Sequence, residues 1–271
     1  MNPATVQLAV EHFADFLLKY FVALAAVGAL AMALIELGKA LFDWRMRFQA
    51  RATTLWILLD TQPKEAAPAF GQLLHLCTGV PLKSASRAAQ ELLESKGRLP
   101  GFVRVHPRDE YAVFALDMER MAGHFEDAVD VVLNSPQQYK ALFNFVTRGA
   151  KSDDRKLWRT LAHERRPANG QSLPDEGLVK QRADVYARLH QVTKRKLDAF
   201  QLYTSTRWVN TVQLWANILG VGILGAAFVY VRPQDLQQKW ILYVGMTLLG
   251  GVLAPVAKDI VVALQQVRQR V

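Results

Sequence analysis

The sequence contains a single cysteine, Cys77, so the chain can neither form an internal disulfide nor hold a metal ion in a cluster of cysteines. Cysteine usage of this kind is typical of proteins from a reducing compartment. Cys77 lies in the apolar run LLHLCTG, which indicates a buried and inert thiol rather than a nucleophile. No chemical role is predicted for it.

Sequence patterns typical of enzymes are also missing. The HERR run at residues 163–166 lacks the second histidine of a zinc-protease helix, and no glycine-rich phosphate loop precedes a Lys-Ser or Lys-Thr pair. His75 lies two residues from Cys77, a spacing that points the two side chains away from each other on a helix. We therefore predict that the protein is not an enzyme, with no catalytic residue and no cofactor.

Nucleic acid and metal ions are not predicted as ligands either. The basic residues of the second half of the chain follow no pattern of interleaved aromatic residues and no known recognition fold. The formal net charge of +9 instead fits the excess of Lys and Arg on the cytoplasmic loops of membrane proteins. Glu119, Glu126 and Asp130 share one helical face, but hard cations usually need carboxylates and carbonyls that converge from a loop.

Three apolar stretches are present, each long enough to cross a bilayer as a helix. Residues 208–231 carry no charge, and after VRPQDLQQK the chain returns as the apolar residues 240–257. Residues 16–37 form the first stretch, and the acidic Glu11 and Asp15 before it argue against a signal peptide. We predict an all-α protein with three transmembrane helices, of which the last two form a hairpin.

The basic residues that flank these stretches predict the orientation. Arg45 and Arg47 follow the first span, Arg195 and Arg207 precede the second, and Lys258 follows the third. The positive-inside rule then places the N-terminus outside and the C-terminus in the cytoplasm of a multi-pass protein of a plasma or bacterial inner membrane. The predicted parts are an N-terminal segment with the first span (1–43), a cytoplasmic helical domain (44–207), the hairpin (208–258) and a C-terminal cytoplasmic helix extension (259–271).

The predicted cytoplasmic domain is helical almost throughout. Helices are expected over residues 44–60, 66–77 and 84–96, the last with Ser84 as its cap and Gly97 as its stop. Apolar residues from 111 to 132 recur three and four apart, which predicts one helix that continues through Gly123. Ser135 followed by a proline predicts another helix start, as does Ser152 followed by two aspartates.

The last helix of this domain is predicted to be the longest in the protein. It begins near Asp175, and no Gly or Pro occurs between Gly177 and Gly220, which lies within the second span. The simplest prediction is a continuous rod from the cytoplasm into the membrane. The polar side of this rod is basic, with Lys180, Arg182, Arg188, Lys194, Arg195 and Lys196.

The basic rod and the acidic helix between Asp109 and Asp130 have opposite charge. One interpretation is an electrostatic latch or a contact between subunits. The other is two solvated helix faces, because exposed ion pairs each contribute only about 0–1 kcal/mol. The charges alone favour neither.

Polar and small residues follow one face of each predicted hairpin helix. On the second span the face is made of Asn210, Gln213, Asn217 and Gly220, at spacings of three and four. Amides are poorly accommodated by lipid, so this face is expected to contact protein or water. The matching face of the third span contains Thr247, Gly250, Gly251 and Ala254, and Pro255 is its predicted hinge.

Two functions follow from this organisation. The first is a non-enzymatic, oligomeric interaction or sensor module in the lipid bilayer, whose helical domain binds a cytoplasmic protein or further copies of the chain. The alternative is an oligomeric ion channel or membrane-disrupting effector that this domain gates, with the amides of the second span turned toward a polar pore.

Overall fold

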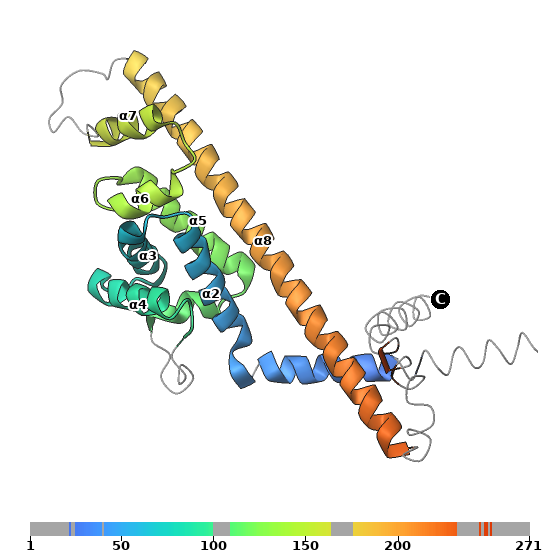
Figure 1. The fold of residues 1–271 in the computed structure, drawn as a ribbon. Helices are drawn as coiled ribbons and strands as arrows, with labels where there is room; N and C mark the ends of the chain where they lie inside the picture. Colours follow the sequence, from blue (N-terminus) through green and yellow to red (C-terminus); the bar gives the residue numbers. More distant parts are fainter. Residues whose placement is uncertain are drawn as a thin grey trace, which may run out of the picture. The chain divides into compact units, whose positions relative to one another are not determined.

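The computed structural model of this chain describes residues 22, 25–39, 41–99, 109–163 and 176–231, together with 244, 247, 248 and 250. Every regular element in these ranges is a helix, and no strand occurs among them, which confirms the all-α prediction for the described residues (Figure 1). The chain divides into two compact units. We call Asp43–Arg207 the helical domain, and Met1–Phe42 with Trp208–Val271 the apolar unit.

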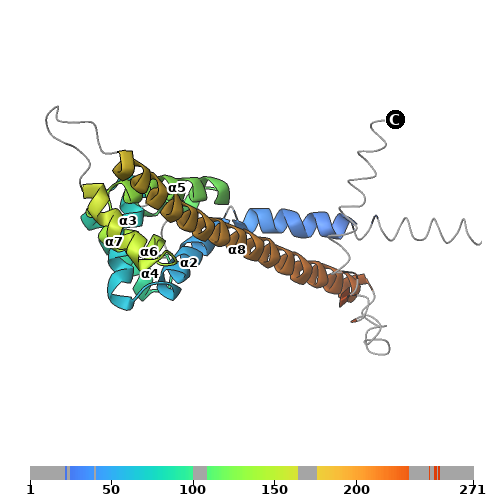
Figure 2. The same ribbon diagram turned by 90° about the horizontal axis from the view of Figure 1, so that it is seen from above.

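Seven helical elements lie entirely within the helical domain, and an eighth, α8, begins there and ends in the apolar unit. In order they are α2 (Trp44–Leu59), α3 (Pro63–Thr78), α4 (Leu82–Glu94), the 3₁₀ helix η1 (Asp109–Ala115), α5 (Met118–Asn134), α6 (Lys140–Val146), α7 (Ser152–His163) and α8 (Glu176–Val231). Within the helical domain, α8 lies alongside α5 and α7 in both views (Figure 1, Figure 2).

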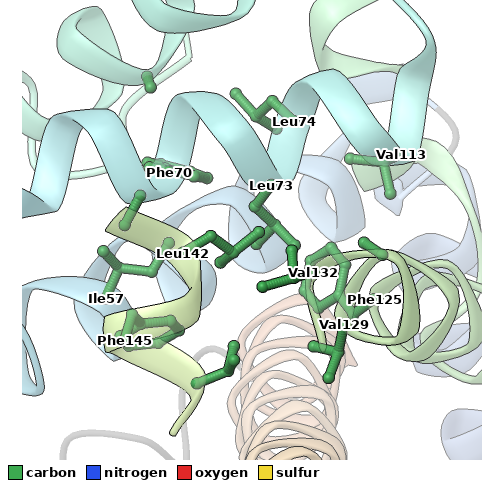
Figure 3. Close-up of a cluster of buried hydrophobic side chains, with 14 of the residues drawn as sticks. Ile57, Phe70, Leu73, Leu74, Val113, Phe125, Val129, Val132, Leu142 and Phe145 are labelled. Carbon is green, nitrogen blue, oxygen red and sulfur yellow. The ribbon is translucent and has the colours of Figure 1, made fainter. Parts of the chain in front are cut away.

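The core of the helical domain contains buried apolar side chains from all eight elements, and Figure 3 shows the part where residues of α2, η1, α5 and α6 lie close to α3. Phe70 and Leu73 of α3 are almost completely buried against residues of α5 and α6. Each such side chain contributes about 1.5–3 kcal/mol by leaving water. The labelled members are Ile57, Phe70, Leu73, Leu74, Val113, Phe125, Val129, Val132, Leu142 and Phe145.

Helices α3 and α4 approach each other closely at a glycine. A Cβ atom added to Gly71 would lie 2.8 Å from the Cα atom of Ser86, which is closer than two such atoms can pack. The absence of a side chain at this position therefore allows the α3–α4 contact.

The predicted helices exist, but several begin elsewhere than expected. Ser84 is not a cap, because α4 already begins at Leu82 with Pro81 as its N-cap. The predicted stop is correct, because Gly97 follows the end of α4 with a φ of +79° that favours glycine. Ser135 is not an N-cap either, since its backbone N–H donates to the carbonyl of Val131 at 2.9 Å and closes α5.

The single helix predicted from Asp109 to Val132 is two elements. The 3₁₀ helix η1 ends at Ala115, and α5 begins at Met118. Asp117 separates them because its carboxylate accepts a hydrogen bond from the backbone N–H of Arg120 at 2.9 Å. An aspartate in this position caps a new helix. Its extended backbone ends the helical conformation there, although the apolar periodicity of the sequence continues through it.

The prediction of a long continuous helix is confirmed for the described residues. Helix α8 runs from Glu176 to Val231 as one helix of 56 residues, without a break between Tyr203 and Trp208. Its predicted start at residues 172–175 lies outside the described residues. The predicted helix start at Ser152 is confirmed by α7.

Among the described residues, α8 is the one helix long and apolar enough by itself to cross a membrane. Its most apolar stretch is only 11% buried, unlike the core helix of a soluble protein. The helix Ala25–Lys39 and α2 meet the same criterion only when they are taken together as one broken span. Because Ala50 and Ile57 of α2 are fully buried in the core of the helical domain, we assign α2 to that domain. The predicted third span lies almost entirely outside the described residues, so the count of three spans stays a prediction.

Candidate functional site

Aromatic side chains attach α8 to the rest of the helical domain. Trp56 of α2 stacks on Phe200 of α8, with ring centroids 4.4 Å apart. The edge of Phe145 from α6 meets the same indole at 4.8 Å, and Phe125 of α5 lies 6.0 Å from Phe200. Aromatic pairs at such distances contribute about 0.5–1.5 kcal/mol each beyond the burial of their area. We call these four residues the aromatic cluster.

Lys196 extends from α8 beside this aromatic cluster, and only 15% of its side chain is exposed. Its ammonium group forms an ion pair with Asp60, donates to the carbonyl of Phe145 at 2.5 Å and lies 3.8 Å from the centre of the Phe145 ring. Burial lowers the pKa of Lys196 from its usual range, although the nearby carboxylate of Asp60 opposes this effect. The charge is thus held where water hardly reaches it, by one carboxylate, one carbonyl and the rings of Phe145 and Trp56.

A second charged contact joins α8 to α7. The guanidinium of Arg188 donates twice to the carboxylate of Asp154, from Nε at 3.0 Å and from Nη2 at 2.7 Å. These hydrogen bonds lower the pKa of Asp154 and raise that of Arg188. The paired geometry sets the register between the two helices as well as their attraction.

The acidic face of α5 also reaches the basic side of α8. Lys194 lies 4.0 Å from Glu126, and His190 lies 3.6 Å from Asp130. Side chains in both pairs are between about a third and three-fifths exposed, so each contact is worth about 0–1 kcal/mol at most. The acidic residues of α5 and the basic residues of α8 therefore meet within one chain. The buried Lys196, however, pairs with Asp60 and not with the acidic residues of α5 that the charge pattern indicates.

The four residues predicted to share one face of α8 differ in exposure. Asn210 and Gln213 are exposed, Asn217 is half-buried and Gly220 is buried. Ala216, four residues before Gly220, is only 2% exposed, so the chain covers the side of α8 that carries these two small residues. The amides of Asn210 and Gln213 lie outside that covered side.

Two residues of the predicted matching face are described, and both are buried. Thr247 donates from its hydroxyl to the carbonyl of Val244 at 2.9 Å, and Gly250 is also buried. A Cβ atom on Gly225 of α8 would lie 3.9 Å from the Cγ2 atom of Thr247, so Thr247 lies next to α8 near Gly225. The remaining members of that face and the predicted hinge lie outside the described residues: Gly251, Ala254 and Pro255.

Cys77 is half-buried, and its thiol lies 3.4 Å from the carbonyl oxygen of His124. Burial raises the pKa of this thiol well above its usual range, and the negative charge of Asp127 raises it further. The group is therefore a neutral thiol at physiological pH. Within the residues described, no group of three His, Cys, Asp or Glu side chains is arranged to hold a metal ion.

Comparisons of the chain with protein families, with curated proteins and with solved structures give no match. No activity is therefore carried over from a relative. Two features of α8 bear on function: its attachment to the helical domain and its exposed apolar end.

Sequence reasoning missed the partners of Lys196. Lys196 belongs to the run Lys194-Arg195-Lys196, which resembles a solvated basic face. One signal was present, because Lys196 lies three residues after Thr193 and four before Phe200, and both of these are buried. Lys196 thus lies on the helix side next to the buried Thr193 and Phe200, whereas Lys194 and Arg195 are exposed.

Proposed function

We propose that this chain is a non-enzymatic, membrane-anchored interaction or sensor module, in which α8 couples the helical domain to a transmembrane segment. The observation that carries the proposal is the continuity of α8 from Glu176 to Val231. Its earlier part is held in the helical domain by the aromatic cluster and by Lys196. Its later part exposes apolar side chains.

A bilayer accounts for those exposed side chains. Apolar residues are exposed along the later part of α8, and a continuous apolar surface of this kind marks a contact with protein or membrane. Lys39, which pairs with Glu36 at 2.7 Å, lies 5.7 Å from the centre of the Trp208 ring. Tryptophan and lysine side chains of this kind are typical of the membrane–water interface. The exposed apolar residues of α8 from this region onward are Val209, Leu214, Trp215, Ile218, Val229 and Tyr230.

The proposed topology keeps three spans, with the N-terminus outside and the C-terminus in the cytoplasm. The first span includes the helix Ala25–Lys39, whose Leu30, Leu34 and Leu37 are exposed. The third span comprises residues 240–257. The charge asymmetry of the flanking segments supports the orientation, with the helical domain on the cytoplasmic side.

Self-association is proposed because Asn210 and Gln213 are exposed on a helix that also exposes Leu214 and Ile218. An amide within a bilayer is costly unless protein or water satisfies it. Contact with a second copy of α8 would provide amide partners and cover apolar surface at the same time.

The same exposed amides support a second candidate, an oligomeric ion channel. If several copies of α8 surround an axis, Asn210 and Gln213 can face water in a pore instead of a neighbouring helix. The half-buried Asn217, one turn further along, then continues this polar face.

Ion flux separates the two candidates. The purified full-length chain is reconstituted into liposomes loaded with a fluorescent ion reporter, and its oligomeric state is measured by cross-linking in the same liposomes. Wild type is compared with a variant in which Asn210, Gln213 and Asn217 are replaced by Leu. The control is Leu214→Val with Ile218→Val, which changes the same helix without altering its polarity.

The interaction module predicts an oligomer without ion flux. Flux that the triple replacement abolishes and the control variant retains would establish the channel instead. Flux that survives the triple replacement would remove these three amides from any pore. A monomer in the liposomes would contradict self-association.

A further inference from the structure

A pocket of about 320 Å³ lies in the helical domain, where the end of α2 and the start of α3 meet α6 and α7. Its volume is at the lower end of the range of about 300–1,000 Å³ that is usual for small-molecule sites. No predicted function uses this pocket. The residues that line it are Asp60, Thr61, Gln62, Glu65, Asn144, Phe145, Arg148, Arg155 and Arg159.

The pocket is rich in guanidinium groups. Three arginines line it against two carboxylates, and both carboxylates already have partners. Asp60 pairs with Lys196 and lies 3.7 Å from Arg148, while Glu65 accepts a hydrogen bond from the amide of Asn144 at 3.4 Å. Arg155 and Arg159 therefore lie in a pocket whose two carboxylates are already paired with other residues.

Three hydrogen-bonding atoms of the lining are buried without a partner. They are the Nε atoms of Arg155 and Arg159 and the hydroxyl oxygen of Thr61. Buried polar groups are almost always paired, and a charged one without a partner is especially unfavourable. These atoms come from α7 and from the turn after α2, so their convergence indicates a ligand that accepts hydrogen bonds.

Arg159 is already oriented for such a ligand. Its Nη2 atom donates to the side-chain oxygen of Asn144, and its guanidinium carbon lies 5.2 Å from the centre of the Phe143 ring. Arg155 lies one turn earlier on α7, so the two guanidinium groups come from the same helix face. Contacts that hold a side chain in place before binding reduce the entropy lost on binding.

We propose that this pocket binds a small anion that carries a phosphate group. The planar guanidinium matches the oxygens of phosphate with two parallel hydrogen bonds, and the hydroxyl of Thr61 can donate another. The phosphate can belong to a soluble molecule or to a lipid headgroup, and the recognition chemistry is the same. Binding does not depend on the membrane function proposed above, because every lining residue belongs to the helical domain.

Isothermal titration calorimetry with pyrophosphate tests the proposal. The full-length chain is studied in maltoside detergent, which contains no phosphate, and saturable binding in the submillimolar range is expected. The Arg155→Gln/Arg159→Gln variant loses two charged donors and should bind at least about tenfold more weakly. The matched control, Arg120→Gln/Arg195→Gln, removes the same charge from residues outside the pocket and should bind as wild type does.

A gain of affinity provides a test that misfolding cannot imitate. Glu65→Gln removes a negative charge from the pocket, but its amide oxygen can still accept the hydrogen bond from Asn144. This variant should bind pyrophosphate several-fold more tightly than wild type. The proposal is overturned if wild type does not bind, if the double arginine variant binds as wild type does, or if Glu65→Gln does not bind more tightly.

Mixed micelles that contain phosphatidylinositol phosphates distinguish the two sources of phosphate. A lipid headgroup in the pocket would compete with pyrophosphate and weaken its apparent affinity for wild type. Unchanged affinity would assign the pocket to a soluble phosphate compound. The lipid headgroup binds in the pocket if the lipid competes with pyrophosphate as strongly in the control variant as in wild type, but does not compete in Arg155→Gln/Arg159→Gln.

Discussion

Lys194 and Lys196 are two residues apart on α8 and have different environments. The side chain of Lys194 is 57% exposed and that of Lys196 is 15% exposed. The difference arises because a helix advances by about 100° per residue, so that Lys196 falls beside the buried stripe and Lys194 on the solvent side. Only Lys196 reaches Asp60 and the aromatic cluster.

At the residue scale, we expect Lys196→Ala to destabilise the helical domain by about 1–3 kcal/mol. The replacement leaves Asp60 without its ammonium partner and removes the cation that lies over the Phe145 ring. The loss is smaller than for a fully buried pair, because Asp60 is 41% exposed. Denaturant unfolding followed by circular dichroism, in detergent, measures the change.

Lys194→Ala is the control for this replacement. Its ion pair with Glu126 is exposed on both sides, so we expect a change within about 0.5 kcal/mol. Equal destabilisation by the two replacements would show that the burial of Lys196 contributes nothing beyond an exposed charge.

At the scale of the element, α8 combines two surfaces in one helix. In the helical domain its buried residues recur three and four apart, as in any helix that packs on a core. They are Val185, Leu189, Thr193, Leu197, Phe200 and Thr204. Beyond Arg207 the exposed residues are mainly apolar, so the same helix passes from a face that packs on the core to an exposed apolar surface.

Continuity of α8 predicts slow amide hydrogen exchange between Tyr203 and Trp208 in the full-length chain. Thr206→Pro removes one backbone hydrogen bond and clashes with the preceding turn, at a cost of about 3 kcal/mol. Exchange in this segment should therefore become faster in the variant, while α3 and α5 stay protected. Mass spectrometry of proteolytic fragments measures both regions.

Thr206→Ala is the control, because alanine preserves the helix and the residue is exposed. Fast exchange between Tyr203 and Trp208 in the wild type would contradict a continuous helix. It would also separate the helical domain from the proposed transmembrane segment.

At the scale of the whole molecule, the two units differ in what surrounds their apolar residues. In the helical domain most large apolar side chains are buried in one cluster, although a few, such as Leu59 and Leu202, are exposed. In the apolar unit Leu34, Leu37 and Leu214 are among many that are exposed. Exposed apolar surface of this kind marks a contact with protein or membrane, and we propose a bilayer as the environment of the apolar unit.

Reporter fusions test this arrangement in cells. A reporter after Gln238 and one at the C-terminus should lie on opposite sides of the membrane, because the proposed hairpin places a span between them. A third fusion, to a chain that ends at Arg207, should report the same side as the C-terminus. If the first two fusions report the same side, the chain has no third span, and the proposed orientation fails with it.

Local patterns in the sequence were sufficient to predict much of the fold. The all-α class, the helix that begins at Ser152 and the unbroken course of α8 follow from apolar residues spaced three and four apart and from the distribution of glycine and proline. These signals are local, because a helix makes its backbone hydrogen bonds within the same segment. The same local signals misplaced the starts at Ser84 and Ser135, where backbone contacts with neighbouring turns decided the boundary.

Only the tertiary structure decided which partners the buried charged residues have. Asp60, Phe145 and Lys196 lie far apart along the chain, and nothing in their local sequence predicts that they meet. The same is true of the arginine pocket, which joins the end of α2 to α7. The sequence by itself determined where helices form and where apolar surface is left over. Packing determined the sites, because a site requires side chains that converge from distant segments.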